Sequence, residues 1–204
     1  MAMKKAERLN PRKKPHQTRS SATVDTLLEA AARILQEEGL ERFNTNRIAE
    51  KAGFSVGSLY QYFPSKEAML TALIRRERAA LLEDIHATAD AGRSLPFGQI
   101  VRWLVACAAR HQMNNPELAR QLEYAEEHLP LNDEARELNL KIVATVEQVL
   151  AENAISDAGI KARDVVALTR GIVDAAALAG ESDEEAIAER AFRAVAGYIG
   201  LTSD

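Results

Sequence analysis

The chain has 204 residues, a length that suits one or two compact domains with a buried core. Ala is frequent, Gly and Pro are sparse, and nothing reads as a strand, so the composition favours helix. The single cysteine, Cys107, excludes an internal disulfide and indicates a reducing compartment. No apolar run approaches the ~18 residues needed to cross a bilayer, and no hydrophobic segment follows the basic N-terminus. We therefore expect a cytoplasmic protein without membrane association.

The formal net charge of −4 is unevenly distributed along the chain. Residues 1–80 hold 15 Lys and Arg against 9 Asp and Glu, which gives +6, whereas residues 81–204 hold 11 against 21, which gives −10. This asymmetry indicates that the first part alone meets a polyanion, unless it is a chance fluctuation. Residues 1–20 are the most basic segment, and Pro11 and Pro15 interrupt any helix there, so we expect a disordered arm that lies along phosphates or is a solvated tail.

Helical periodicity begins at Ser21. One apolar stripe of about four turns, ended by Gly39, is formed by Val24, Leu27, Leu28, Ala31 and Leu35. A short helix follows from Thr45, a typical N-cap residue, and Gly53 comes after it. A second short helix begins after Ser55 and ends at Pro64, and a longer helix capped by Ser65 runs to about His86.

Five more helices are expected in the rest of the chain, separated by Gly, Pro, Asn and Ser. They cover about residues 96–113, 116–128, 133–153, 161–179 and 183–199. The sequence thus predicts an all-α fold of about nine helices.

The segment from Thr45 to Phe63 has the layout of a helix-turn-helix, in which the second helix enters the major groove of DNA. Ala49 and Ala52 let the two helices cross closely, and Gly57 and Ser58 leave the exposed side of the second helix free of bulk. From this pattern alone, a helical hairpin inside an ordinary bundle is the alternative.

Residues 24 to about 74 closely resemble the DNA-binding domain of the tetracycline-repressor (TetR) family. The matching segments are Asn44-Thr45 before Ile48-Ala49-Glu50-Lys51-Ala52-Gly53, then Phe54-Ser55-Val56-Gly57-Ser58-Leu59-Tyr60-Gln61-Tyr62-Phe63, then Pro64-Ser65-Lys66-Glu67. Phe54 and the pair Asn46-Arg47 depart from the commoner residues of the family.

The resemblance implies a homodimer with a ligand pocket in its C-terminal half. It also implies DNA contacts at Thr45, Asn46, Arg47, Ser55, Val56, Gly57, Ser58, Tyr60, Gln61, Tyr62 and Lys66. We expect three parts: a basic arm at residues 1–20, a DNA-binding domain of three helices at residues 21–66, and an effector-binding and dimerisation domain at residues 67–204.

The function predicted from these features is that of a DNA-binding transcriptional regulator, a ligand-released repressor that binds double-stranded DNA as a homodimer. Its operator would be palindromic, with half-sites one helical turn, roughly 34 Å, apart. A transcriptional activator or a nucleoid-organising protein of the same fold is the alternative.

A helical enzyme is the competing class of protein. A di-iron bundle needs two Glu-x-x-His motifs and two further Glu, whereas this chain has one such spacing, Glu83 with His86. The sequence has no His-Glu-x-x-His zinc motif and no phosphate-cradling loop. We therefore expect no catalytic residue, no metal site and no cofactor apart from a small-molecule effector of unknown identity.

The last two predicted helices are rich in small residues, which allow close helix crossing. We expect them to form the dimer interface through Ile172, Val173, Ala176, Ile187, Ala191, Ala194, Val195 and Tyr198. Packing within one chain is the alternative explanation of this pattern.

Candidate residues of the ligand pocket come from the middle helices. They are Trp103, Cys107, Arg110, His111, Met113, Glu123 and Tyr124. Trp103, Cys107 and Arg110 share one side of a helix and could contact an amphipathic molecule, although such residues are more often core. Cys107 is either a thiol sensor or a core residue.

Overall fold

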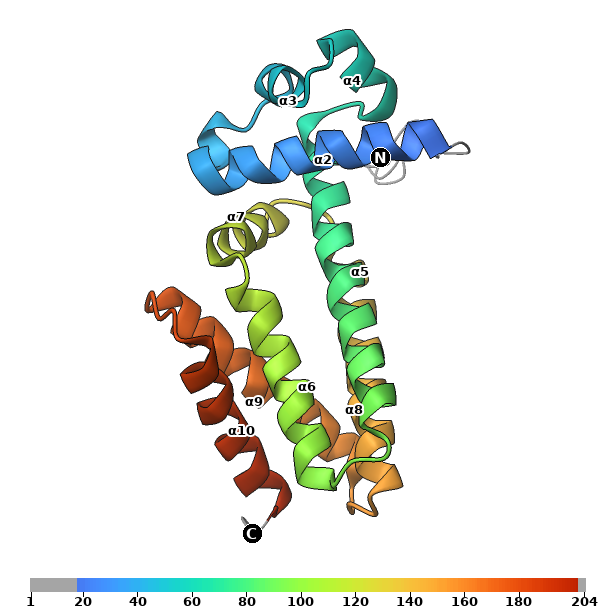
Figure 1. Cartoon of the computed structure of the whole chain (residues 1–204), viewed down its shortest axis with the longest axis vertical. Helices are drawn as coiled ribbons and strands as arrows, with labels where there is room; N and C mark the ends of the chain where they lie inside the picture. Colours follow the sequence, from blue (N-terminus) through green and yellow to red (C-terminus); the bar gives the residue numbers. More distant parts are fainter. Residues whose placement is uncertain (1–17, 202–204) are drawn as a thin grey trace. The chain divides into compact units, whose positions relative to one another are not determined.

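The computed structural model describes residues 18–201, which form nine α-helices and one 3-10 turn without any strand (Figure 1). Residues 1–17 of the predicted basic arm lie outside this range. The elements are α2 (Thr18–Glu38), η1 (Leu40–Arg42), α3 (Thr45–Ala52), α4 (Val56–Tyr62), α5 (Lys66–Gly92), α6 (Phe97–Met113), α7 (Pro116–Glu126), α8 (Asn132–Glu152), α9 (Ala158–Leu178) and α10 (Glu184–Ile199). The predicted all-α fold is confirmed. None of the helices between residues 18 and 201 combines the length and apolar character needed to span a membrane.

Side-chain caps fix where the short helices start. Ser55 accepts a hydrogen bond from the Ser58 N–H at 3.0 Å, and Ser65 accepts one from the Ala68 N–H at 3.2 Å, as predicted. The cap of α3 is Asn44 and not Thr45. The Asn44 side chain accepts from the Arg47 N–H at 3.0 Å and donates to the Arg42 carbonyl at 3.1 Å, so it joins η1 to α3.

The chain divides into two compact units. The first contains the chain up to Glu77 together with Glu117–Leu131, and the second contains Arg78–Pro116 and the chain from Asn132 onward. Helix α5 runs through both units. From the sequence, everything after residue 66 was expected in the effector-binding domain, whereas the structure places α7 and the turn after it in the same unit as the helix-turn-helix.

The apolar face of α7 explains this placement. Leu118, Leu122, Ala125, Leu129 and Leu131 are buried in the same cluster as the core residues of α2, α3 and α4. Since α7 buries its apolar face within this cluster, the first unit is built from two segments that lie far apart in the sequence.

In the second unit, α6, α9 and α10 pack together and α8 packs on α9. Its core contains Val101 and Val105 of α6, Ala162 and Val165 of α9, and Ala191 and Val195 of α10. On the surface, the Arg102 guanidinium lies 3.8 Å from the centroid of the Phe192 ring and pairs with Glu189, which ties α6 to α10.

Replacing Leu122 with Ala tests the placement of α7. Leu122 is 5% exposed, so the cavity should lower the free energy of unfolding by about 2–4 kcal/mol. Urea unfolding gives the size of the loss, and amide hydrogen exchange should show faster opening of α2. Leu140→Ala on α8 is the control, because Leu140 is 61% exposed and its loss should cost less than about 0.5 kcal/mol. Unchanged exchange in α2 of the Leu122 variant would contradict this packing.

Candidate nucleic-acid interface

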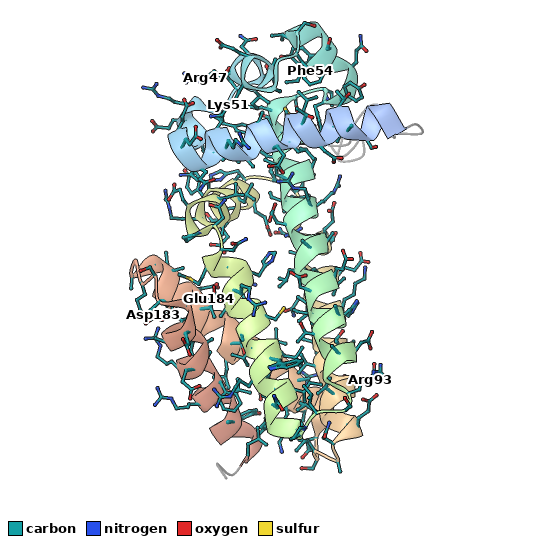
Figure 2. All side chains as sticks on the ribbon, in the orientation of Figure 1. Arg47, Lys51, Phe54, Arg93, Asp183 and Glu184 are labelled. Atoms are coloured by element: carbon teal, nitrogen blue, oxygen red, sulfur yellow. The ribbon has the colours of Figure 1, made fainter. Side chains whose placement is uncertain are left out.

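A tight turn at Gly53 joins α3 to α4. Gly53 has φ +73° and ψ 27°, in the left-handed region that favours glycine. Its N–H donates to the Glu50 carbonyl at 3.1 Å, and the Phe54 N–H donates to the Ala49 carbonyl at 2.9 Å, which ends α3. Phe54, labelled in Figure 2, lies in the turn and packs half-buried against the core. This packing accommodates an aromatic side chain at a position where it departs from the commoner residues of the family.

Burial on one side of these helices fixes what is exposed on the other. Ile48 and Ala49 of α3, Leu59 of α4 and Phe63 just after it have no exposed surface. The helix-turn-helix predicted from the sequence is therefore present, and the second helix of the pair is α4.

The exposed face of α4 is polar. Ser55, Gly57, Tyr60 and Gln61 are exposed, and the Ser55 and Ser58 hydroxyl oxygens lie 2.8 Å apart at the start of the helix. Hydroxyl and amide groups of this kind donate to phosphate oxygens and to base edges. Val56 and Tyr62, two further predicted contact residues, pack half-buried against the core, so each also contributes to the stability of the fold.

A second group of polar side chains lies at the start of α3. The Thr45 hydroxyl lies 3.1 Å from the Tyr60 hydroxyl, so the first turn of α3 and the middle of α4 share one polar surface. Asn46 is exposed next to Thr45. The N–H groups of a helix start favour phosphate. At the start of α5, Lys66 is exposed and has no ion-pair partner among residues 18–201, so its ammonium group is available to a phosphate.

The two cations of α3 are paired with the end of α2. Arg47 forms an ion pair with Glu38, and Lys51 forms one with Glu37. Figure 2 shows Arg47 and Lys51 on α3 near the carboxyl-terminal end of α2. These pairs were not predicted from the sequence. Glu37 and Glu38 lie side by side at the C-terminus of α2, where the helix macrodipole disfavours negative charge, and this could have indicated that they pair with cations.

The seven predicted ligand residues are divided between the two units. Trp103, Cys107, Arg110, His111 and Met113 belong to α6 in the second unit, whereas Glu123 and Tyr124 belong to α7 in the first. Trp103 is 41% exposed and Tyr124 is 56% exposed. Neither unit by itself assembles all seven residues into one site.

Cys107 is buried and faces α5. Burial raises the pKa of its thiol, and a hydrogen bond with Thr88 offsets this rise in part. The thiol is therefore protonated at neutral pH, whereas a reactive sulfur requires the thiolate. These surroundings favour the core role for Cys107.

A shallow hollow of about 120 Å³ lies between α5 and α8 in the second unit. Arg93 lines it and pairs with Asp90 at 3.0 Å and with Glu152 at 3.9 Å. None of the predicted ligand residues lines this hollow. Its walls are polar and largely exposed, whereas a small-molecule pocket is usually apolar with few polar groups.

Most of the predicted dimer residues are buried inside the second unit. Val173, Ala176, Ile187, Ala191 and Val195 are at most 3% exposed, so their side chains stabilise the single chain. Ile172 and Ala194 are half-buried, and Tyr198 is exposed. Tyr198 donates a hydrogen bond to Asp164, which raises the pKa of the phenol.

Apart from Tyr198, the exposed face of the same helices consists of residues that were not predicted for the dimer interface. It includes Ile160, Ala167, Gly171, Ala175 and Leu178 on α9, and Gly197 and Tyr198 on α10. Ile160 is 53% exposed and Leu178 is 80% exposed, which is unusual for large apolar side chains. Ile160 and Leu178 were not predicted for this face from the sequence, because α9 has apolar residues on more than one side.

Known proteins are similar to this chain over the segment that contains the helix-turn-helix. Residues 27–73 match the model of bacterial regulatory proteins of the tetR family. The nucleoid occlusion factor SlmA of Haemophilus ducreyi is 46% identical over 52 residues, which are 26% of each chain, so the match spans about a quarter of that relative. SlmA of Vibrio atlanticus is 28% identical over 144 residues, 69% of this chain and 72% of the relative.

One solved structure extends the likeness to most of the fold. SmeT, the repressor of the Stenotrophomonas maltophilia multidrug efflux pump SmeDEF, is 18% identical with a TM-score of 0.64, and the match covers 86% of this chain and 89% of that one. At this identity the likeness concerns the fold. The matched segment, residues 27–73, spans the capped α3, the Gly53 turn and the exposed α4. Residues 27–73 therefore form a domain of the tetR family of bacterial regulatory proteins.

Proposed function

We propose that this chain is a transcriptional repressor that binds double-stranded DNA as a homodimer and leaves its operator when a small-molecule effector binds. The observation that carries the proposal is the exposed polar side of the helix-turn-helix. There the Thr45 and Tyr60 hydroxyls lie 3.1 Å apart, Gln61 is exposed, and Lys66 has no ion-pair partner among residues 18–201. Such a surface offers hydrogen bonds to phosphates and bases on a helix that is short enough to enter the major groove. The repressor SmeT, which shares the fold, supports this direction of regulation.

The homodimer would form through the exposed face of α9 and α10. Small residues at Ala167, Gly171 and Ala175 allow a second copy to approach closely, and the exposed side chains of Ile160 and Leu178 supply apolar area at the two ends of α9. A symmetric pair of this kind presents two copies of α4 to DNA, so the operator would be palindromic with half-sites roughly 34 Å apart.

The effector would bind near α6. Trp103, half-exposed, and Arg110, exposed and 3.5 Å from Glu184, offer an aromatic face and a charged group on one side of the helix. An amphipathic molecule fits this chemistry. Effector binding would favour a dimer whose two α4 helices are spaced differently, and operator affinity would fall by the coupling free energy. Binding to the operator requires that the protein shares a compartment with the DNA, and we therefore propose a cytoplasmic location.

A role in nucleoid organisation is the second candidate. The relative from Vibrio atlanticus is a nucleoid occlusion factor and aligns with 69% of this chain. Many dispersed binding sites would favour this role, whereas few sites near promoters would favour a regulator. An activator would be recognised by the position of its operator relative to the promoter.

Selection of genomic DNA fragments by the purified dimer tests the proposed function. We expect a palindromic motif with half-sites one turn apart. Lys66→Gln should reduce the slope of log affinity against log salt by about one per protomer, because one phosphate contact is lost on each side. Tyr60→Phe, which keeps the ring, should weaken operator binding through the lost hydroxyl. Selection of no motif by the wild-type chain would contradict a sequence-specific regulator.

Glu38→Gln tests whether the carboxylate restrains Arg47. Since ion pairs near the surface contribute about 0–1 kcal/mol and the Arg47 side of this pair is exposed, releasing Arg47 should tighten binding to unrelated DNA by up to about fivefold and steepen its salt dependence. Titration of a fluorescent duplex without the operator motif measures both. Glu41→Gln, an exposed acid in η1, changes the net charge equally and is the matched control. Equal effects of the two variants would mean that general charge and not the pair is responsible.

Gly171→Arg tests the proposed dimer surface. Nothing lies within 4 Å of a Cβ built at Gly171, so the protomer can accommodate the side chain while a partner helix at this face cannot. Light scattering should give the mass of one chain for Gly171→Arg and of two for the wild type. Gly171→Ala is the control and should remain a dimer, because Ala is also small and favours helix. A dimeric Arg variant would exclude this face as the interface.

A further inference from the structure

One hydrogen bond links α7 directly to the turn between α2 and α3. The Gln121 Oε1 accepts from the backbone N–H of Leu40 at 3.1 Å, although the two residues are 81 positions apart. The contact is partly buried, so water does not freely replace the acceptor. Leu40 itself packs half-buried against the core of the first unit, which also contains the apolar face of α7.

The orientation of the Gln121 amide is fixed by its neighbours on α7. Its Nε2 donates to Glu117 Oε1 at 2.8 Å, and Arg120 donates to both oxygens of the same carboxylate at 2.6 and 3.0 Å. Hydrogen bonds from Arg120 and Gln121 hold the pKa of the Glu117 carboxyl below its ordinary value, so Glu117 is ionised at neutral pH. An ionised Glu117 accepts only, and this leaves the Gln121 oxygen for Leu40.

The turn that receives this bond needs a fixed shape. Gly39 has φ +74°, and a Cβ placed there would lie 3.4 Å from the Gln121 nitrogen. Glycine at this position therefore provides the left-handed backbone conformation, whereas a Cβ would only make ordinary contact with the Gln121 amide.

From Leu40, hydrogen bonds lead to the start of α3. The Phe43 N–H donates to the Leu40 carbonyl at 3.2 Å, and the Asn44 side chain donates to the Arg42 carbonyl at 3.1 Å. Asn44 then caps α3 by accepting from the Arg47 N–H at 3.0 Å. The first turn of α3 is thus connected, bond by bond, to a side chain of α7.

We propose that Gln121 is a positioning residue for DNA binding: it fixes the α2–α3 turn and, through Asn44, the first turn of α3 against the phosphate backbone. The inference rests on the proposed function, because it concerns the same surface. It assigns a role in DNA affinity to a residue outside the segment that matches the family model, and Gln121 does not need to touch DNA.

Gln121→Met tests this role, because Met keeps the length of the side chain and removes the acceptor. We expect operator affinity to fall about five- to tenfold and the salt slope to decrease by about one per protomer, since misplacing the start of α3 loses a phosphate contact. Amide hydrogen exchange should show loss of protection at Leu40. Gln148→Met, the same neutral change at an exposed glutamine of α8, is the control and should leave all three measurements unchanged.

A swap of the two side chains separates positioning from general destabilisation. In the double variant Glu117→Gln with Gln121→Glu, the carboxylate at position 121 would accept from the Leu40 N–H, and the amide at position 117 would donate to that carboxylate. We expect affinity within about twofold of wild type and restored protection at Leu40. Simple destabilisation would reduce the fraction of active protein and leave the salt slope unchanged.

The outcomes are distinguishable. If Gln121→Met binds the operator with the affinity and salt slope of the wild type, the inference is overturned and the proposed function stays intact. Reduced affinity with an unchanged slope, and no recovery in the swap, would also overturn it. A wild-type chain that selects no DNA motif would remove the proposed function, and the inference with it.

Discussion

The DNA-binding surface depends on burying one side of two short helices on a common core while the chain reverses between them. Helices α3 and α4 have eight and seven residues, lengths at which an isolated helix is not stable in water. Full burial of Ile48, Leu59 and Phe63 supplies the stability, and Gly53 supplies the left-handed turn. Because the inner side chains fix the rotation of each helix, Thr45 and Tyr60 are brought within hydrogen-bonding distance.

Electrostatics around this surface are local. The net charge of −4 does not oppose DNA binding, because fields at an ionic strength near 0.15 M decay over about 8 Å. Both cations of α3 are already paired with acids of α2, while Lys66 is unpaired among residues 18–201. Arg47 is the more exposed partner of its pair with the half-buried Glu38, and ion pairs near the surface contribute little, so a phosphate can compete for Arg47. Specificity would then come from a few hydrogen bonds and from the shape of the DNA.

Helix α7 makes the first unit a composite of distant segments. Its leucines are buried among core residues of the helix-turn-helix, and Gln121 completes the backbone hydrogen bonding of a turn. A segment placed by sequence order in the effector-binding half is therefore structurally part of the DNA-binding unit.

The sequence by itself determined the all-α fold, the number of helices, the helix-turn-helix and the caps at Ser55 and Ser65, because these depend on residues within one or two helical turns of each other. Thr45 was an acceptable cap by type, and Asn44 took the role because its amide also reaches the Arg42 carbonyl. Only the tertiary structure decided that Glu37 and Glu38 pair with α3, that α7 belongs with α2, and that Val173, Ile187 and Val195 face inward while Ile160 and Leu178 face outward. The physical reason is that a helix with apolar residues on several sides does not specify which side its own chain will cover.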